Sequence, residues 1–91
     1  MMPTVKFTYA LKRFFPGLKD TPAKGAMLTD ILEEIEIAYP GIGSYILDEH
    51  GNLRRHVNIF INGAMIPDRT KLNSPVAEKS EIHIIQALSG G

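Results

Sequence analysis

Residues 28–41, LTDILEEIEIAYPG, decide the fold because they contain the clearest helix of the chain. Six apolar side chains recur at steps of three and four residues, which predicts a helix with one buried stripe: Leu28, Ile31, Leu32, Ile35, Ala38 and Tyr39. We expect the acidic residues on the opposite face only to keep the protein soluble, and Ile37 to lie outside the stripe. Pro40-Gly41 ends the helix, since proline disfavours helical geometry at the residue before it.

Stretches with a period of two lie before this helix and predict strands. Alternating apolar residues from Val5 to Leu11 predict the first strand. Pro16-Gly17 predicts a turn, and residues 18–23 predict a short second strand. Pro22 places this strand at the sheet edge, because proline lacks the amide that a central strand needs. The chain is therefore expected to open with a hairpin.

The pattern after the helix predicts the rest of the sheet. Residues 42–47 predict a short helical turn, and residues 57–61 predict a strand that stops at Asn62-Gly63, a strong hairpin signal. A very short strand over 64–66 and a last strand over 81–87 follow. The connection between these two contributes two residues that we expect to reach the core: Leu72 and Val76.

This order of elements predicts an α+β protein with the β-grasp (ubiquitin-like) fold. We expect a mixed four- or five-stranded sheet, with the first and last strands parallel in its centre and one main helix across one face. Residues 1–87 are predicted to form the domain, and residues 88–91 a flexible C-terminal di-glycine tail.

Composition excludes several classes of function. Ten basic and ten acidic residues cancel, which argues against nucleic acid as a partner, since phosphate binding needs a cationic excess. The absence of cysteine excludes disulfides and thiolate chemistry. The three histidines, His50, His56 and His83, match no compact metal-ligand spacing, so we expect no metal site. With no predicted signal peptide or membrane span, the expectation is a cytoplasmic protein that is monomeric when free.

The C-terminal residues Gly90 and Gly91 are the candidate chemical site. A terminal carboxylate has a pKa of about 3.3–3.7, so it is ionised at neutral pH and is a poor acyl donor. Adenylation would convert it into a mixed anhydride that sulfide, a thiol or an amine can attack. Glycine lacks a Cβ and therefore suits a narrow channel that keeps water from such an anhydride. A frayed, chemically idle tail is the alternative.

A docking surface for a partner is predicted near this tail. Phe60 points opposite to the apolar residues of its own strand, and Ile85 shares that sheet face if the last strand keeps its register. We group Phe60 and Ile85 with Leu88 and Ser89 as the partner-docking hypothesis; the alternative is that the chain's start or the 67–75 connection covers them. Arg54 and Arg55 either steer an acidic partner or form a solvated flank.

Three segments carry a resemblance to a known family: ILEE…AYPGI at 31–42, VNIFING at 57–63 and EIHII…GG at 81–91. They are similar to the MoaD/ThiS family of ubiquitin-like sulfur carriers. The longer form LRRHVNI at 53–59 is most similar to the carrier of thiocarboxylate-dependent cysteine synthesis. The pair Leu88-Ser89 departs from the Val-Ala or Val-Thr pair usual in the family, which bears on the choice of partner.

The resemblance implies a carrier and not an enzyme, with no catalytic residues and no bound cofactor. A ubiquitin-activating-like enzyme would adenylate Gly91 with ATP and Mg²⁺, and sulfur transfer would leave a C-terminal thiocarboxylate. A second partner, a sulfur-accepting synthase, would use it in molybdopterin, cysteine or thiamin synthesis or in tRNA thiolation. Two alternatives stay open: a protein modifier joined through Gly91 to lysines, and a non-conjugating interaction domain.

Overall fold

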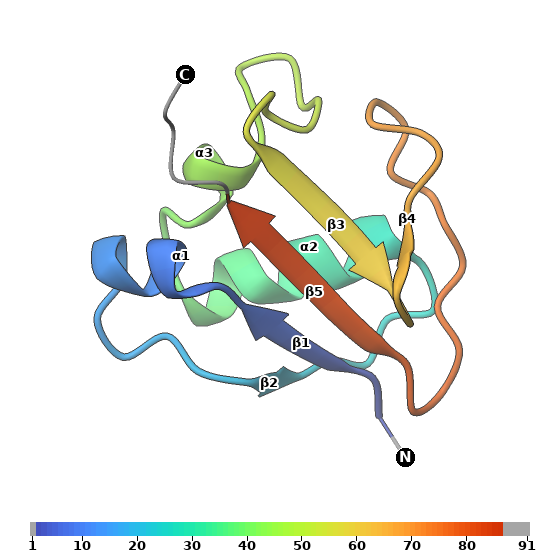
Figure 1. The fold of residues 1–91 in the computed structure, drawn as a ribbon. Helices are drawn as coiled ribbons and strands as arrows, with labels where there is room; N and C mark the ends of the chain where they lie inside the picture. The colour runs from blue at the N-terminus through green and yellow to red at the C-terminus, as the bar shows by residue number, and fades with distance from the viewer. Residues whose placement is uncertain (1, 87–91) are drawn as a thin grey trace.

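The structure is a computed structural model that describes residues 2–86. Its five strands form one mixed sheet in the order β2-β1-β5-β3-β4 (Figure 1). The strands are β1 (Thr4–Phe7), β2 (Thr21–Pro22), β3 (Val57–Ile61), β4 (Ala64–Met65) and β5 (Glu81–Gln86). β5 is central, parallel to β1 and antiparallel to β3, and β2 is at one edge. The predicted β-grasp arrangement is thereby confirmed.

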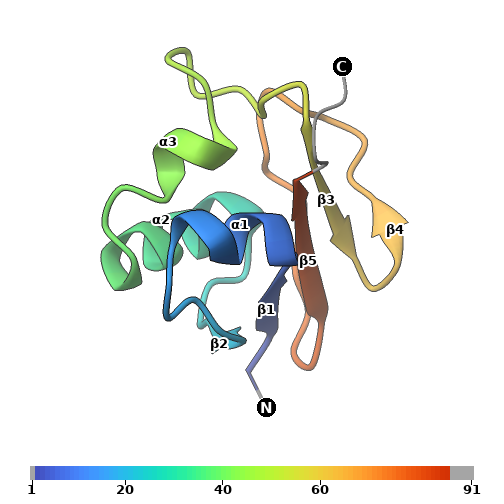
Figure 2. The same ribbon diagram turned by 60° about the vertical axis from the view of Figure 1, so that its left-hand side comes forward.

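The main helix, α2 (Leu28–Ala38), packs on one face of this sheet as predicted. Of the predicted stripe, Leu28, Ile31 and Ile35 are buried, and Leu32 and Tyr39 pack partly buried against the core. Ala38 is exposed, so the buried stripe is shorter than predicted. Ile37 lies outside the stripe and is 80% exposed. The sheet contributes the alternate residues of its central strands to the same core: Val5, Val57, Ile59, Ile82 and Ile84. Leu72 and Val76 close the core from the connection between β4 and β5, as the sequence predicts. Figure 2 shows that α1, α2 and α3 lie on this one side of the sheet.

The first predicted strand is too long, because it ends at Phe7 and is followed by a helix, α1 (Tyr9–Phe14). Ala10 and Leu11 are the buried residues of α1. The alternation of apolar residues continued past Phe7 by chance, whereas Ala10, Leu11 and the two basic residues after them all favour helix. The second strand is also shorter than predicted, and α1 separates it from β1, so the opening is not a tight hairpin.

Two turns confirm their sequence signals. The short helix α3 (Gly43–Ile46) occupies the place predicted for a helical turn. Asn62 and Gly63 join β3 to β4 with positive φ angles of 52° and 85°, the geometry expected of an Asn-Gly hairpin.

The acidic face of α2 does more than keep the protein soluble, so that interpretation was wrong. Glu34 accepts hydrogen bonds from the backbone amides of Lys24 and Gly25, at 2.8 and 2.7 Å. A Cβ at Gly25 would lie 2.6 Å from the Cβ of Asp30, so only glycine allows this approach. Glu36 accepts the amides of Gly41 and Gly43, which lowers the pKa of its carboxyl. The two glutamates thus attach the connections on both sides of α2 to the helix.

Candidate functional site at the C-terminal end of β5

The described part of the chain stops at Gln86, where the central strand ends. Four of the predicted site residues, Leu88, Ser89, Gly90 and Gly91, lie outside residues 2–86, as does Ala87. What the structure defines is the surface from which the predicted tail departs. We call this surface the exit end, and it comprises Thr8 with α1, residues 54–57 and Gln86.

Thr8 holds one side of the exit end. Its backbone amide donates to the carbonyl of Ile84, at 3.3 Å, and its hydroxyl accepts the amide of Gln86, at 3.2 Å. The pairing of β1 with β5 therefore ends at Thr8. There the amide of Gln86 binds the side-chain oxygen of Thr8 in place of a backbone carbonyl of β1. The start of α1 is thereby attached to the last described residue of β5.

Arg69 holds the other side, and nothing in the sequence analysis identified it. Its Nη2 donates to the carbonyls of Arg54 and Val57, and its Nη1 donates to Oδ1 of Asn58 at 2.8 Å. Val57 lies opposite Gln86 in the β3–β5 ladder. The guanidinium of Arg69 therefore fixes the turn beside the exit end. An arginine that binds backbone carbonyls leaves no pattern in sequence, because its acceptors are present at every residue.

The two described members of the docking hypothesis, Phe60 and Ile85, lie half-buried on the sheet face away from the helices. Phe60 pairs with His83 and Ile85 pairs with Asn58, so the two are diagonal neighbours. Met65 on β4 pairs with Phe60, is 53% exposed and extends this apolar surface. In Figures 1 and 2 no helix covers this face. The structure places Phe60 and Ile85 together, and their role in docking stays a prediction.

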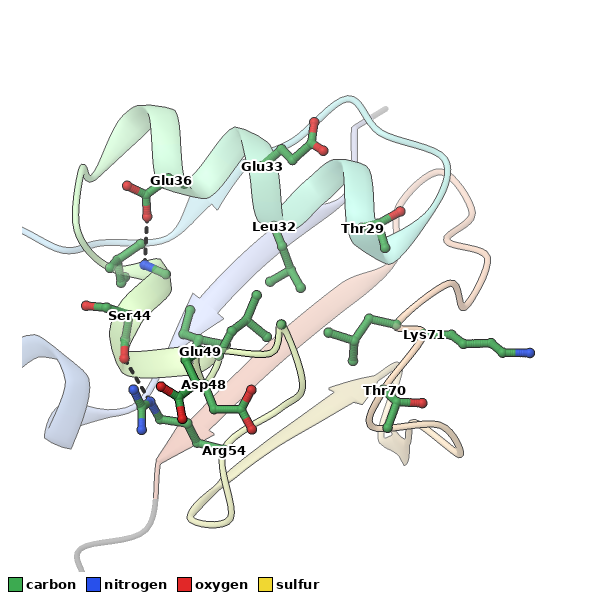
Figure 3. Close-up of a pocket in the computed structure, with 16 residues that line it drawn as sticks. Thr29, Leu32, Glu33, Glu36, Ser44, Asp48, Glu49, Arg54, Thr70 and Lys71 are labelled. Carbon is green, nitrogen blue, oxygen red and sulfur yellow. Dashed lines mark hydrogen bonds between the residues drawn. The ribbon is translucent and has the colours of Figure 1, made fainter.

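A groove of about 740 Å³ on the helix side is the other candidate for a site (Figure 3). It lies between α2, α3, residues 47–54 and residues 70–72, and Leu32 points into it from α2. Several of its charged groups already serve the fold. Glu36 binds the start of α3, and Arg54 Nε donates to the carbonyl of Ser44 at 2.8 Å. The backbone amide of Asn52, followed by that of His50, lowers the pKa of the Asp48 carboxyl.

The described residues hold no group of three or more histidine or acidic side chains placed to bind a metal ion. Within the same residues, no helix is long and apolar enough to span a membrane. The exit end, from which the predicted tail departs, is the better candidate for the site.

The profile of the ThiS family matches residues 5–91, which include β1 from its second residue, β2 to β5 and the terminal glycines. The chain belongs to the ThiS family. Its curated relatives include the sulfur carrier protein CysO of Mycobacterium tuberculosis, 29% identical over 93 residues and covering all of both chains. Family membership and this full-length likeness support the sulfur-carrier function expected from the sequence. Sulfur carriers are not themselves enzymes.

Solved structures show the same fold. A chain from the BexX/CysO complex of Amycolatopsis orientalis has a TM-score of 0.82 and 26% identity, covering 98% of this chain and 99% of that one. Small archaeal modifier protein 1 of Methanosarcina acetivorans has a TM-score of 0.77 and 28% identity, covering 98% and 95%. The first of these is a complex of a carrier with a protein partner. The second is named as a modifier, so both functions occur among the structural neighbours of this chain.

Proposed function

We propose that this ThiS-family chain is a sulfur carrier that is adenylated at the Gly91 carboxylate and then bears sulfur as a C-terminal thiocarboxylate. The observation that carries the proposal is the family match, which extends through Gly90 and Gly91 to the last residue. The geometry of β5 supports it. β5 is described as far as Gln86, and the five residues from there to Gly91 would reach roughly 17 Å if fully extended.

The chemistry needs a partner, because the carrier supplies only the acyl group. A carboxylate oxygen of Gly91 attacks the α-phosphorus of ATP, and pyrophosphate leaves. Sulfide, or a sulfur donor of the same oxidation state, then adds to the carbonyl carbon, and AMP departs with the electrons of the broken C–O bond. We assign ATP and Mg²⁺ to a ubiquitin-activating-like enzyme, and no bound cofactor to this chain.

The sulfur acceptor is the finer part of the proposal. A sulfur-accepting synthase would take the sulfur for molybdopterin, cysteine, thiamin or thiolated tRNA. Of these, the resemblance of residues 53–59 favours cysteine synthesis. The synthase and the activating enzyme would then contact the predicted docking residues differently, and this difference would contribute to the choice of partner. These residues are Phe60, Ile85, Leu88 and Ser89.

A protein modifier is the second candidate, favoured by the likeness to the small archaeal modifier protein of Methanosarcina acetivorans. In that case the activated carbonyl of Gly91 would be attacked by a lysine amine, with loss of AMP or of an intermediate thiol. Both candidates require the same terminal carboxylate.

Intact-mass spectrometry tests the proposal. The chain is incubated with ATP, Mg²⁺, sulfide and the ubiquitin-activating-type enzyme of its source organism. Replacement of one oxygen by sulfur adds roughly 16 Da, and we expect this gain for the native chain but not after deletion of Gly91. An Ile37→Ala variant, at an exposed residue of α2 that has no assigned role, is the control and should gain the same mass. Lysine conjugates without the thiocarboxylate would favour the modifier, and an unmodified native chain would overturn the proposal.

A further inference from the structure

Two exposed aromatic rings stack on each other between α1 and α3. The rings of Phe14 and Tyr45 have centroids 5.3 Å apart and planes at 24°, and Phe15 meets Tyr45 edge-on at 5.2 Å. Phe14 is 55% exposed and Tyr45 is 36% exposed. Rigid, solvent-exposed aromatic pairs are costly to leave in water and are enriched at the centres of protein interfaces. We call Phe14 and Tyr45 the aromatic patch.

The aromatic patch lies close to the exit end. Thr8, which binds the amide of Gln86, immediately precedes α1. From Tyr9 to Phe14 the helix rises only about 7.5 Å. The five residues after Gln86 reach no further than roughly 17 Å. A partner that encloses Gly91 in its active site must therefore bring its own surface to within reach of Phe14 and Tyr45.

Exposed cations adjoin the patch and the exit end along the chain. Lys12 and Arg13 form the last turn of α1, and Arg54 and Arg55 lie just before Val57, which pairs with Gln86. Within residues 2–86, Lys12, Arg13 and Arg55 form no ion pair. Arg54 Nε binds the carbonyl of Ser44, and the charge of Arg54 also helps to lower the pKa of Asp48. Although the whole chain has no net charge, three cations of this surface, Lys12, Arg13 and Arg55, therefore lack an acidic partner among residues 2–86.

We propose that the aromatic patch and the cations Lys12, Arg13, Arg54 and Arg55 form a docking surface for an acidic, partly apolar surface around the tail channel of the activating enzyme. The inference rests on the proposed function, since it needs an enzyme that takes up Gly91. The rings supply the desolvated centre of the interface, and the cations steer an acidic partner and raise the rate of encounter. This surface is separate from the Phe60–Ile85 sheet face, which is left available to the sulfur acceptor.

Kinetics of adenylation test the cations. ATP–pyrophosphate exchange is measured with the source organism's ubiquitin-activating-type enzyme and the double variant Arg13→Glu/Arg55→Glu. The matched control is Lys24→Glu/Lys79→Glu, which makes the same change in net charge at exposed residues away from the exit end. In Arg13→Glu/Arg55→Glu we expect the KM for the carrier to rise about tenfold or more, with kcat little changed. In the control we expect the native KM and kcat. The KM of the native carrier should also rise with salt up to about 0.15 M, and that dependence should weaken in the first variant.

A second pair of variants tests the rings. Phe14→Ala should raise the KM several-fold, whereas Ile37→Ala, which removes a more exposed apolar side chain from α2, should not. Thermal unfolding confirms that each variant is folded. Equal KM values for the exit-end variants and their controls, with the native chain adenylated normally, would overturn the docking surface and leave the proposed function intact. A native chain that is not adenylated at all would instead overturn the proposed function.

Discussion

The two ends of the central strand β5 differ in how their polar groups are used. At its start, the backbone amide of Asn62 donates to the carbonyl of Glu81 at 2.9 Å. The backbone amide of Glu81 donates in return to Asn62 Oδ1, also at 2.9 Å. Asn62 Nδ2 donates to Ser80 Oγ, and Ser80 is only 2% exposed. Lys6 lies 3.6 Å from the carboxylate of Glu81. At this end the polar and charged groups satisfy one another.

At the exit end the backbone is fixed just as firmly, but the charges are not paired. Thr8 and Arg69 satisfy the amide and carbonyl groups around Gln86 and Val57. Beside them, Arg13 and Arg55 remain exposed without an acidic partner among residues 2–86. The contrast separates two tasks. The start of β5 contributes to the stability of the fold alone, whereas the exit end combines a rigid backbone with side chains available to another molecule.

The largest expected effect on stability comes from a core residue of β5 that lies between its two ends. Ile84 is fully buried and its strand neighbours are Phe7 on β1 and Ile59 on β3. Ile84→Ala should lower the free energy of unfolding by about 2–5 kcal/mol, since it removes buried methyl groups and leaves a cavity. Urea unfolding measures this loss. Ile37→Ala is the control with nearly no loss expected, and an equal loss in both variants would show that Ile84 is not a core residue.

A smaller loss is expected when only the exit end is disturbed. Arg69→Met removes the donors to the carbonyls of Arg54 and Val57, which should cost about 1–3 kcal/mol of stability. Hydrogen exchange should accelerate at the amides of Val57 and Gln86 before it does so at the start of β5. Arg69→Lys keeps the charge without the forked donors, so an intermediate loss is expected. Unchanged exchange at both amides in Arg69→Met would contradict the assigned role of Arg69.

The start of β5 should affect stability without affecting activation. Asn62→Ala removes the side-chain bonds to Ser80 and Glu81 and places alanine at a positive φ, so a loss of about 1–2 kcal/mol is expected. Asn62→Gly tolerates that φ and isolates the contribution of the bonds. In ATP–pyrophosphate exchange, both variants should keep the native KM. A raised KM would remove the distinction between the two ends.

Long periodic segments allowed most of the fold to be predicted from sequence. The stripe of α2, the alternation in β3 and the Asn62-Gly63 turn each have a strong local pattern. The pattern from Val5 to Phe14 is ambiguous because it fits both the two-residue period of a strand and the 3.6-residue period of a helix. The strand ends at Phe7 because its pairing with β5 ends there. The helix α1, which lies beside the exit end, was therefore missed.

The candidate site was predictable only in part, for a different physical reason. The proposed tail chemistry rests on the identity of Gly90 and Gly91, and these residues lie outside the described part of the chain. The support around the tail depends on contacts between distant segments. Arg69 acts on backbone carbonyls, and the stacking of Phe14 on Tyr45 requires α1 and α3 to lie together, so neither leaves a local pattern.

The smallest expected effect concerns the loop that carries Arg69, and it depends on pH. Oδ1 of Asp68 accepts hydrogen bonds from the Thr70 hydroxyl at 2.7 Å and from the amides of Thr70 and Lys71 at 2.8 and 3.0 Å. These bonds, the hydroxyl first, lower the pKa of Asp68 from 3.8 to about 2. Because the folded pKa lies below the unfolded value, the contribution of Asp68 to stability is complete above about pH 4 and is lost as the pH falls toward 2.

Urea unfolding across this pH range tests the contribution of Asp68. Asp68→Asn keeps a side-chain acceptor but removes the titration, so its stability should fall less steeply than that of the native chain between about pH 4 and pH 2. Asp20→Asn is the matched control and should follow the native curve, because the Asp20 side chain accepts no hydrogen bond among residues 2–86. If Asp68→Asn also follows the native curve, the Asp68 carboxylate does not stabilise this loop. The position of Arg69 at the exit end would then depend on its own hydrogen bonds alone.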